Sequence, residues 1–564
     1  MKKEIFTGSE ILIKSLLEEE VEYIFGYPGG AIMPIYDAIH HYQDEISHIL
    51  TRHEQGAIHA AQGYARVTGK VGVCFTTSGP GATNLITGLV DALIDNTPLV
   101  CITGQVPSYL LGTDAFQETN IMDLSISATK WNAQVTDVRD LCKVIRQAFY
   151  IAKSGRPGPV LVDITKNAQF QTAYFNYSFC TSVNNFTPYP KVEERGVQAA
   201  AQLIDASEKP LAIIGQGVIL AHAEKELKYF IEKTGIPVAS TLLGLGAIEN
   251  SHPLHVGMVG MHGNYAPNIL TNECDALIAI GMRFDDRVTG DVKRYAKQAR
   301  VIHLEIDPCE IGKNIPCDVP ILGDCKISLP KLTDRVQKNN HQAWICSFDK
   351  LRAEEEENVM RNDLHPTKKG LTMGEAIRWI NHYKQDNAIL VTDVGQHQMI
   401  TSRYFDFTVS KTQITSGGLG TMGFALPAAI GAQLGAKDRQ VICVAGDGGI
   451  QMTLQELGSI LQYDIPIKIV LLNNNFLGMV RQWQQLFFDK RYSCTELVNP
   501  DFVQLANAYN ISGKKVERRE NLAAAVEKMF DHKGPYLLEV VVEREDNVFP
   551  MITSGAAVNE IRLT

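Results

Sequence analysis

Short apolar runs that end in glycine-rich turns recur along this 564-residue chain, and each is followed by a segment with helical periodicity. This alternation is typical of βα units, in which helices connect parallel strands. It predicts an α/β fold built on parallel sheets. The predicted strands are residues 21–26, 71–77, 98–104 and 159–164 in the first third, 210–217, 237–241, 275–281 and 299–307 in the middle third, and 388–395, 440–448, 466–474 and 535–543 in the last third.

Two polar stretches separate these groups of strands. Residues 181–196 contain proline and asparagine, and the stretch from Lys338 to about Lys369 contains a run of glutamates. Such composition is typical of linkers, and the glutamates are expected on a solvated helix face. We expect three α/β domains, at residues 1–180, 190–340 and 365–550, which are of ordinary domain size.

The formal net charge of −10 leaves no positive excess that would attract nucleic acid or an anionic membrane. No run approaches the roughly 18 apolar residues that a membrane-spanning helix needs, and the first residues lack the apolar core of a signal peptide. The 11 cysteines are scattered singly, which is typical of a reducing compartment. We therefore expect a cytoplasmic protein with no nucleic-acid or membrane partner.

The strongest local signal is formed by Gly446-Asp447-Gly448 and Asn473-Asn474, each of which directly follows an apolar strand. Asn474 lies 27 residues after Asp447, which fits one strand–helix–strand crossover and puts both side chains at adjacent strand ends. A carboxylate and an amide oxygen suit a hard divalent cation that also binds phosphate oxygens. The glycines allow close approach of an anion, and the following helix presents free N–H groups. Plain turns are the alternative.

Two further clusters fall in the same predicted domain. Residues 416–435 read SGGLGTMGFALPAAIGAQLG, a glycine-rich loop followed by a helix of small residues, and residues 394–398 read VGQHQ at another strand end. Three such clusters at one sheet edge favour a binding site over plain turns.

With these motifs the chain resembles the thiamine-diphosphate enzymes, in which GDG is followed about 27 residues later by NN. The resemblance implies two thiamine-diphosphate-binding domains, one for the pyrimidine and one for the diphosphate, flanking a central Rossmann-like domain. It implies Mg²⁺ held by Asp447, Asn474 and the main-chain oxygen of Phe476. It also implies that the following residues bind the cofactor: Gln396, His397, Gly420, Met422, Gly446 and Gly448.

Glu54 opens a helix-like stretch, EQGAIHAAQGYARVTG. A lone glutamate on a helix is ordinarily solvated, but the small apolar residues beside it (Ala57, Ala60, Ala61 and Tyr64) allow a buried carboxyl. In the resembling family, a glutamate in this setting hydrogen-bonds the aminopyrimidine and so activates the thiazolium carbon. That role needs a raised pKa, which burial supplies.

Residues 76–84, TTSGPGATN, follow a predicted strand and carry the signal of a helix start. By themselves they could form a plain turn. In the resembling family they lie beside the cofactor across a subunit interface, which implies a homodimer or a homotetramer.

Four segments, at residues 26–38, 112–118, 281–290 and 478–484, are similar to the large catalytic subunits of the biosynthetic acetolactate synthase family. The similarity implies that pyruvate is decarboxylated and that the remaining hydroxyethyl carbanion condenses with pyruvate or 2-oxobutyrate. The products are 2-acetolactate and 2-aceto-2-hydroxybutyrate, on the route to valine, leucine and isoleucine. The family also implies a small regulatory subunit.

The same similarity assigns roles to individual residues. Gln117 and Phe116 are expected to line the substrate pocket, and Lys166 the channel that leads to it. Trp483 is expected to shape the acceptor site, and Met422 to lie under the cofactor.

Each of these assignments has a plain alternative. Met479 and Trp483 are four residues apart and could form a core stripe, and Met422 could fill a gap in a core. The family usually reads D-L-P-K-D where this chain has D-I-T-K-N, so that Thr165 replaces a proline beside Lys166. The replacement leaves the placement of the lysine open.

The middle third contains G-x-G at Gly215 and Gly217, but position 220 is leucine, so the dinucleotide-binding fingerprint is broken. The family resemblance nevertheless implies FAD in this region. Because the reaction involves no net redox change, this FAD is expected to be structural. The implied contacts are Arg156, His262, Arg283, Glu305, Asp307 and Asp324, of which the last two could instead cap helices.

The nearest rival interpretation is another thiamine-diphosphate enzyme of 2-oxo acids, such as a pyruvate oxidase, which would reduce its flavin. A nucleotide-binding oxidoreductase and a non-catalytic regulatory homologue are more distant alternatives. The broken fingerprint disfavours the oxidoreductase, and the presence of Glu54 and Asp447 disfavours the non-catalytic homologue.

Overall fold

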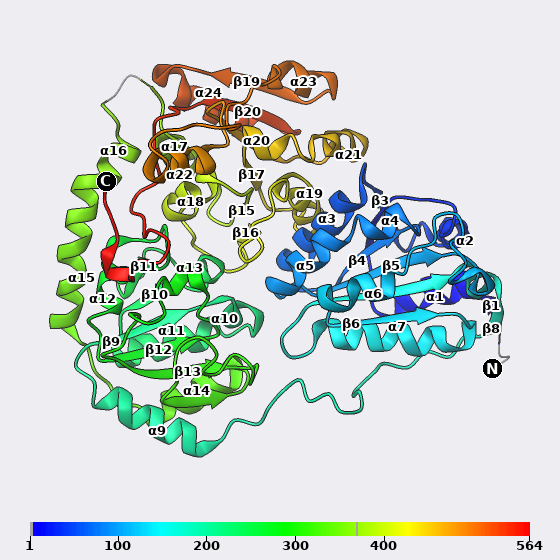
Figure 1. The fold of residues 1–564 in the computed structure, drawn as a ribbon, viewed down its shortest axis with the longest axis horizontal. Helices are drawn as coiled ribbons and strands as arrows, with labels where there is room; N and C mark the ends of the chain where they lie inside the picture. Colours follow the sequence, from blue (N-terminus) through cyan, green and yellow to red (C-terminus); the bar gives the residue numbers. More distant parts are fainter. Residues whose placement is uncertain (1–3, 368–369) are drawn as a thin grey trace.

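A computed structural model describes residues 4–367 and 370–564. Each third of the chain forms a six-stranded sheet with helices packed around it (Figure 1), and neighbouring strands within all three sheets are parallel. The strand orders are β3-β2-β4-β5-β7-β6, β11-β10-β9-β12-β13-β14 and β16-β15-β17-β18-β20-β19. The predicted α/β fold with three parallel sheets is confirmed.

The first unit is built on β2 (Tyr23–Gly26), β3 (Ser47–Leu50), β4 (Gly72–Thr76), β5 (Leu99–Gln105), β6 (Trp131–Val135) and β7 (Pro159–Thr165). Its helices are α1 (Gly8–Glu18), α2 (Met33–Ile39), α3 (Glu54–Thr68), α4 (Pro80–Thr83), α5 (Ile86–Ile94), α6 (Ile121–Ser125), α7 (Val138–Lys153) and α8 (Lys166–Phe170). A short antiparallel pair, β1 (Ile5–Thr7) with β8 (Thr172–Tyr174), joins the two ends of this unit.

The second unit is built on β9 (Pro210–Ile214), β10 (Val238–Ser240), β11 (His255–Met258), β12 (Ala276–Ile280), β13 (Arg300–Glu305) and β14 (Val319–Leu322). Its helices are α9 (Glu194–Asp205), α10 (Gln216–Leu220), α11 (Glu224–Thr234), α12 (Tyr265–Thr271), α13 (Asp286–Thr289) and α14 (Cys325–Arg335). A long helical segment follows, formed by α15 (Gln342–Glu355), a π-helical turn (Glu356–Met360) and α16 (Arg361–Leu364).

The third unit is built on β15 (Ile389–Thr392), β16 (Gln413–Thr415), β17 (Val441–Gly446), β18 (Lys468–Asn473), β19 (Ser512–Val516) and β20 (Tyr536–Val541). Its helices are α17 (Met373–Tyr383), α18 (Gln396–Tyr404), α19 (Ala425–Gly435), α20 (Asp447–Ile450), α21 (Leu457–Tyr463), α22 (Gly478–Phe487), α23 (Phe502–Ala508) and α24 (Leu522–Asp531). The segment after β20 runs back onto the second unit, where Ile552 and Val558 join its core.

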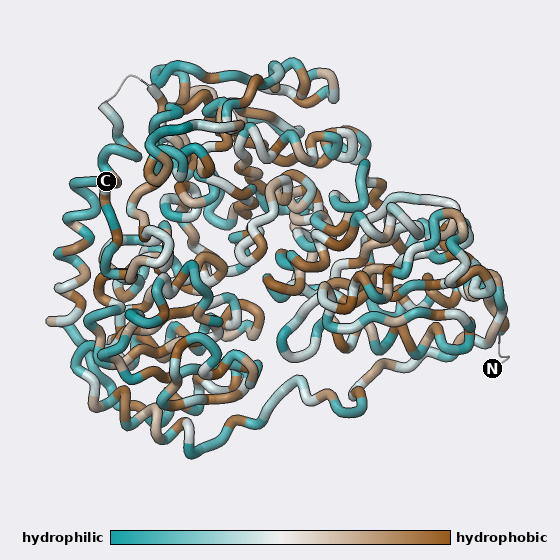
Figure 2. Tube along the Cα trace, viewed as in Figure 1, coloured by the Kyte–Doolittle hydropathy of each residue, from teal (hydrophilic) through white to brown (hydrophobic). Residues whose placement is uncertain are grey.

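The predicted strands match the four central strands of every sheet, whereas both edge strands of each sheet were missed. Central strands of a parallel sheet are covered on both faces and therefore read as continuous apolar runs. The missed edge strands include SGKKV in β19 and WNAQV in β6, whose polar residues hide the pattern. In Figure 2 the apolar segments gather inside each of the three units.

The two predicted linkers differ in structure. Residues 175–193 contain no helix or strand and run between the first two units (Figure 1), but α9 already begins at Glu194, so the predicted end of this linker was wrong by three residues. The second stretch is largely helical, and its last two residues, 368–369, lie outside the described residues, as do residues 1–3 of the predicted first domain. The predicted domain boundaries stay a prediction.

The expectation that the glutamate run is solvated was wrong for one of its members. Glu355 is buried, and its carboxylate accepts a 2.6 Å hydrogen bond from Arg403 Nη2, in an ion pair that is closed to solvent. The same carboxylate accepts hydrogen bonds from Asn264 Nδ2 and Tyr265 N at 3.1 and 2.7 Å. Three donors, two from the second unit and one from the third, compensate the burial of its charge.

The first and third units pack directly through α3 and α19. A Cβ atom added to Gly63 would lie 1.9 Å from the carbonyl oxygen of Ala428, and one added to Gly431 would lie 1.8 Å from that of Ala60. The two helices therefore cross at backbone contact, which requires glycine at both positions. The small-residue face of α3 thus serves helix packing. In the described part of the chain, no helix is both long and apolar enough to cross a bilayer.

Candidate active site

A cavity of about 740 Å³ lies where the three units meet, a volume in the range of small-molecule and cofactor sites. Each unit contributes to its wall. The lining includes Asn96 and Arg156 from the first unit, Gly215, His262, Arg283, Glu305 and Asp324 from the second, and residues 416–420, Met422, Met479 and Trp483 from the third.

A second cavity of about 60 Å³ lies at the carboxyl ends of β15, β17 and β18. The two cavities share Val394, Gly395, Met422, Met479 and Val480, so they adjoin. The small cavity is further lined by Gln396, His397, Gly446, Asp447, Gly448, Asn474 and Phe476. All residues predicted to bind the metal or the diphosphate therefore line the small cavity, with one exception. Gly420 lines only the larger cavity.

Asp447 and Asn474 meet because β17 and β18 are parallel neighbours. Asp447 is buried, and this burial raises its pKa to about 6, although Asn499 and the backbone N–H groups of Asn474 and Asn475 oppose the rise by donating hydrogen bonds to the carboxylate. Asn499 Nδ2 lies 2.7 Å from Asp447 Oδ2. Among the described residues no cationic side chain is bonded to this buried carboxylate, which suits a bound cation.

The other donors at this place are neutral oxygens. The side-chain oxygen of Asn474 accepts a hydrogen bond from Phe476 N at 3.1 Å, which holds the turn that carries the Phe476 carbonyl. Among the described residues there is no group of three or more His, Cys, Asp or Glu side chains that could hold a metal. A cation here would therefore rely on one carboxylate, one amide oxygen and one carbonyl, a donor set that fits Mg²⁺ with phosphate oxygens as the remaining ligands.

His397 provides a second test of the fit. Its Nε2 atom is buried and has no hydrogen-bond partner in the described structure, and burial lowers the pKa of the ring to about 4. Cβ atoms added to Gly395 and Gly446 would lie 2.9 and 2.7 Å from this ring, so both glycines make room for it. A neutral imidazole with an unpartnered nitrogen in the cavity wall fits a hydrogen bond to a bound phosphate.

Gln396 connects the same wall to the next helix. Its Oε1 atom accepts a hydrogen bond from Asn474 Nδ2 at 3.3 Å, and its Nε2 atom donates to Gln482 Oε1 at 2.9 Å. Gln396 on α18 therefore helps to position Asn474, and Gln482 on α22 in turn holds Gln396.

Met422 and Trp483 face the cavities, and so does Met479. The Met422 methyl group lies 3.7 Å from where a Cβ of Gly448 would be, directly over the GDG turn. The Trp483 ring is half-buried and packs on Phe487 with ring centroids 5.0 Å apart. These positions favour cavity walls over a core stripe or a gap-filling methionine.

The residues predicted for FAD gather around the large cavity, with one exception. Arg156 lies at its wall and is bonded to Asp307 at 3.2 Å, Glu310 at 2.9 Å and Asn96 at 2.6 Å. Asp307 lies behind the arginine and does not line the cavity. Its contact to a ligand stays a prediction.

The remaining members of this group line the cavity directly. Burial raises the pKa of Glu305 to about 7, and the N–H groups of residues 306 and 307 donate to its carboxylate at 2.9 and 3.1 Å. Asp324 caps α14 by accepting from Lys326 N at 2.7 Å and also faces the cavity, so both predicted roles of Asp324 are compatible. His262 Nδ1 and Gln216 Oε1 are buried without a partner among the described residues, which leaves polar groups for a bound cofactor.

A third group of predicted residues lies elsewhere, at the carboxyl ends of the strands of the first sheet. The Glu54 carboxylate accepts a 2.9 Å hydrogen bond from Asn84 Nδ2, which ties α3 to the segment after β4. Gln117 has a positive φ of 59° and packs on Gly79. Lys166 donates to the carbonyl oxygen of Gly30 at 3.2 Å.

Glu54, Gln117 and Lys166 line neither of the two cavities. Phe116 beside them is 89% exposed. The expected burial of Glu54 is partial in a single chain, because the small-residue face of α3 packs against α19 and does not cover the carboxyl group.

Two polar residues at the site were missed in the sequence. Asn499 follows no strand, and its only signal is an Asn-Pro turn. Asp393 comes directly after β15. Its burial raises its pKa to about 7, although the N–H groups of Val394 and Gly423 donate hydrogen bonds to its carboxylate. Neither residue belongs to a motif with fixed spacing, so only the tertiary structure reveals them.

Comparison with known protein families gives three matches in chain order. Residues 6–124 match the N-terminal TPP binding domain of thiamine pyrophosphate enzymes, residues 197–332 match the central domain, and residues 393–540 match the C-terminal TPP binding domain.

Individual relatives match over nearly the whole chain. The acetolactate synthase isozyme 2 large subunit of Escherichia coli (strain K12) is 46% identical over 561 residues, which cover 98% of this chain and 99% of the relative. The acetolactate synthase large subunit of Cyanidium caldarium is 42% identical over 98% of this chain and 96% of its own length. Acetolactate synthase 1, chloroplastic, of Nicotiana tabacum is 42% identical over 98% of this chain and 84% of its own length.

Proposed function

The chain belongs to the acetolactate synthase large subunits, a family of thiamine-pyrophosphate enzymes, and from this premise we propose how its residues carry out the reaction. The enzyme decarboxylates pyruvate and joins the remaining two-carbon unit to a second pyruvate or to 2-oxobutyrate. The products, 2-acetolactate and 2-aceto-2-hydroxybutyrate, begin the synthesis of branched-chain amino acids. The observation that carries this proposal is the meeting of Asp447 and Asn474 beside His397, whose Nε2 atom has no partner.

In this proposal Mg²⁺ is held by Asp447, Asn474 and the Phe476 carbonyl, and the cofactor phosphates lie against His397 and the Gly446 turn. The buried Asp447 carboxylate, with its pKa raised to about 6, is ionised near neutral pH and gains a counter-charge when the cation binds. Thiamine diphosphate, when bound, supplies the electron sink for decarboxylation of a 2-oxo acid.

Glu54 is the proposed proton-transferring group. Asn84 donates a hydrogen bond to its Oε2 atom and so fixes the orientation of the carboxylate. Transfer of a proton between this carboxylate and the aminopyrimidine of the cofactor would activate the cofactor as a general acid–base step.

Two copies of the chain are proposed to complete each site. Within one chain, Glu54 and Gln117 lie outside the cavities that contain Asp447 and Met422. Exposed apolar side chains surround both halves, with Phe116 and Ile126 on the first unit and Val480 and Phe488 on the third. A second copy that pairs these surfaces would bury apolar area and bring Glu54 of one chain to the diphosphate side of the other.

The substrate residues follow from the same arrangement. Trp483 and Met422 form one wall of the acceptor site, and Gln117, Phe116 and Lys166 are proposed to close it from the partner copy. The indole is proposed to give the acceptor site a shape that favours the larger acceptor, 2-oxobutyrate.

FAD is proposed to occupy the large cavity as a structural group. The support is its volume of about 740 Å³, the unpartnered His262 Nδ1 and Gln216 Oε1 atoms, and the cationic side chains in the wall, which include Arg156 and Arg283. Because the overall reaction is redox-neutral, FAD would stabilise the junction of the three units.

A small regulatory subunit is also proposed, because the relatives are named large subunits. The proposed location of the enzyme is the cytoplasm, which rests on the use of single cysteines.

Identification of the products by NMR tests the function. The purified protein is given pyruvate and 2-oxobutyrate with thiamine diphosphate, Mg²⁺ and FAD. Acetohydroxybutyrate together with acetolactate is the expected result. Acetate, acetaldehyde or acetyl phosphate in their place would contradict the carboligase reaction and favour an oxidase or a decarboxylase.

A further inference from the structure

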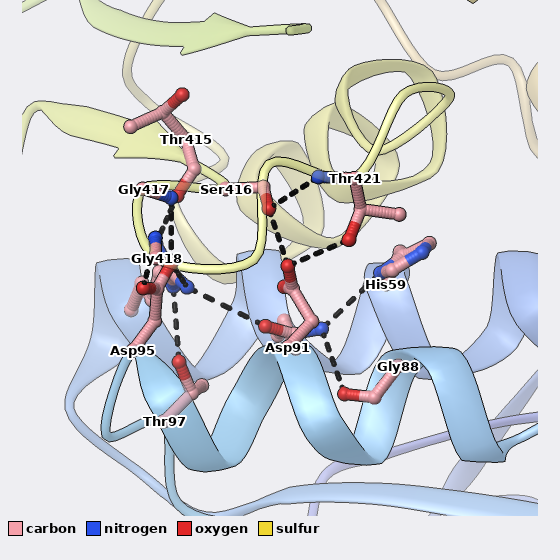
Figure 3. A network of polar contacts seen from close by, with 12 residues as sticks. His59, Gly88, Asp91, Asp95, Thr97, Thr415, Ser416, Gly417, Gly418 and Thr421 are labelled. Carbon is pink, nitrogen blue, oxygen red and sulfur yellow. Dashed lines mark hydrogen bonds and ion pairs between the residues drawn. The ribbon is translucent and has the colours of Figure 1, made fainter. Parts of the chain in front are cut away.

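The loop of residues 416–421, between β16 and α19, is held by α5 of the first unit (Figure 3). The backbone N–H groups of Gly417 and Gly418 each donate a 2.8 Å hydrogen bond to Asp95, one to Oδ2 and the other to Oδ1. Both carboxylate oxygens are therefore used. The Asp95 side chain is fully buried, so these bonds are shielded from water.

Asp91 lies one turn earlier on α5 and holds the two ends of the same loop. Its Oδ1 atom accepts hydrogen bonds from the hydroxyl groups of Ser416 and Thr421, the second at 2.9 Å. Ser416 Oγ in turn accepts from Thr421 N at 2.8 Å. The Asp91 Oδ2 atom is buried and has no hydrogen-bond partner in the part of the chain that the structure describes.

Arg66, near the end of α3, supplies the positive charge of this network. Its Nη2 atom lies 2.9 Å from Asp95 Oδ2, and its side chain is only 7% exposed. The same guanidinium donates to Thr97 Oγ1 at 3.0 Å and to the carbonyl oxygen of Thr415, just before the loop, at 2.5 Å. The arginine thus neutralises Asp95 and ties the loop to a second helix of the first unit.

The opposite side of the loop faces the large cavity. Residues 416–420 and Met422 line that cavity, whereas Asp91 and Asp95 line neither cavity. The two aspartates therefore do not touch the space proposed for the cofactors. Their side chains reach the site through the loop, and Asp95 has two chain neighbours, Ile94 and Asn96, that line the same cavity.

We infer that Asp91 and Asp95 are positioning residues, which set the 416–421 loop so that Gly420 within it and Met422 directly after it face the cavity. The inference rests on the proposed function in taking that cavity to be a cofactor site. It makes the first unit of a chain responsible for the shape of the site on the third unit of the same chain.

The different use of the two carboxylates provides the test. In Asp91→Asn the amide oxygen can keep the position of Oδ1, and the amide nitrogen takes the position of the unpartnered Oδ2. In Asp95→Asn one of two oxygens that accept a glycine N–H becomes a donor, and a bond to the loop is lost. We therefore expect asparagine to be tolerated at position 91 and not at position 95, with Asp91→Ala behaving like Asp95→Asn.

Amide hydrogen exchange of the ligand-free full-length chain measures the loop directly. In Asp95→Asn, exchange at Gly417 and Gly418 should rise by about tenfold to a hundredfold, which is the loss of a hydrogen bond to a charged group. A fluorescence titration with FAD should show a weakening of binding by a similar factor. In Asp91→Asn both quantities should stay within about threefold of the wild-type values.

Asp163→Asn is the matched control, because Asp163 is also a fully buried carboxylate of the first unit, bonded to Thr103, Gln105 and Gln134. This variant should lower the unfolding temperature without changing exchange in the loop. If Asp95→Asn does not fold, Thr421→Val removes a single hydroxyl donor to Asp91 at a residue outside both cavities, and should still raise loop exchange.

The inference would be overturned if the loop of Asp95→Asn exchanged at the wild-type rate, or if the loop of Thr421→Val did so where that variant replaces Asp95→Asn. An equal rise of loop exchange in Asp163→Asn would also overturn it. A wild-type chain that binds neither FAD nor thiamine diphosphate would contradict the proposed function instead. The exchange comparison needs no ligand, so the two failures can be told apart.

Discussion

The side-chain amide of Asn499 donates a 2.7 Å hydrogen bond to Oδ2 of Asp447, from a position 52 residues further along the chain. The same nitrogen lies 3.1 Å from the side-chain oxygens of Asn473 and Asn475. One asparagine thus holds together the two strand ends that carry the proposed metal ligands. Residues of this kind, which orient ligands without binding the metal, tune metal affinity.

Asn499→Ala should weaken Mg²⁺-dependent binding of thiamine diphosphate by about tenfold to a hundredfold, because Asp447 loses its side-chain partner. Fluorescence titrations of the cofactor at several Mg²⁺ concentrations, and with EDTA, measure the effect. Asn507→Ala, at an exposed asparagine on α23, is the control and should bind as the wild type does. Equal cofactor affinity of the wild type with and without EDTA would contradict the metal site.

Glu54→Gln should reduce turnover by at least about a hundredfold while the fold and the affinity for thiamine diphosphate persist, because the amide cannot transfer a proton. Steady-state kinetics and a thermal unfolding scan measure these quantities. Glu45→Gln, an exposed glutamate of the same unit, should keep full activity. Retention of more than a tenth of the wild-type turnover would remove the activating role of Glu54.

Trp483→Leu should shift the product ratio toward acetolactate by about tenfold, since the pocket that discriminates between acceptors loses its indole wall. Competition between pyruvate and 2-oxobutyrate, read by NMR, gives the ratio. Trp379→Leu is a matched control, because that half-buried tryptophan on α17 lines neither cavity. An unchanged ratio would make Trp483 a packing residue.

Thr165→Pro should leave turnover within about threefold and stability within about 1 kcal/mol, because residue 165 already has the φ and ψ of proline, −65° and 145°. The costs are the hydrogen bond from the Thr165 hydroxyl to the Val135 carbonyl, at 3.1 Å, and the backbone N–H of a residue that pairs with Gln105 at the end of β7. The absence of a proline would then not displace Lys166. Steady-state kinetics of Thr165→Pro and of Lys166→Ala test this prediction. An equal loss of turnover in the two variants would contradict it.

Asp393 should make stability fall as the pH rises. Its pKa is raised by burial from 3.8 to about 7, so the folded chain holds a proton that the unfolded chain releases between about pH 4 and pH 7. Linkage then removes up to about 4 kcal/mol of unfolding free energy across that window. Asp393→Asn, with Asp386→Asn as an exposed control, should flatten the pH dependence of the unfolding temperature. Parallel pH profiles for the wild type and Asp393→Asn would refute this.

Sequence reasoning located every central strand and missed every edge strand, and the difference in coverage by neighbouring elements explains the clearest cases. A central strand such as VICVAG in β17 is covered on both faces and must be apolar throughout. An edge strand such as SGKKV in β19 needs little more than backbone pairing with one neighbour, so its side chains carry no pattern.

The meeting of Asp447 and Asn474, on the proposed diphosphate side, was predictable for the same reason. Asp447 and Asn474 follow central strands that pair in parallel, and local spacing along one crossover determines their meeting. The family resemblance added His397 and Met422 at the ends of neighbouring segments.

By itself, the sequence determined the strand–helix alternation, the glycine turns and the residues at the ends of central strands, because these depend on periodicity and on spacing within one crossover. The tertiary structure alone decided that α3 packs on α19, that Asn499 reaches Asp447, and that Asp91 and Asp95 hold the 416–421 loop. These contacts join side chains that are up to hundreds of residues apart. They depend on how the three units dock or, for Asn499 and Asp447, on how the third unit folds, and no local pattern encodes either.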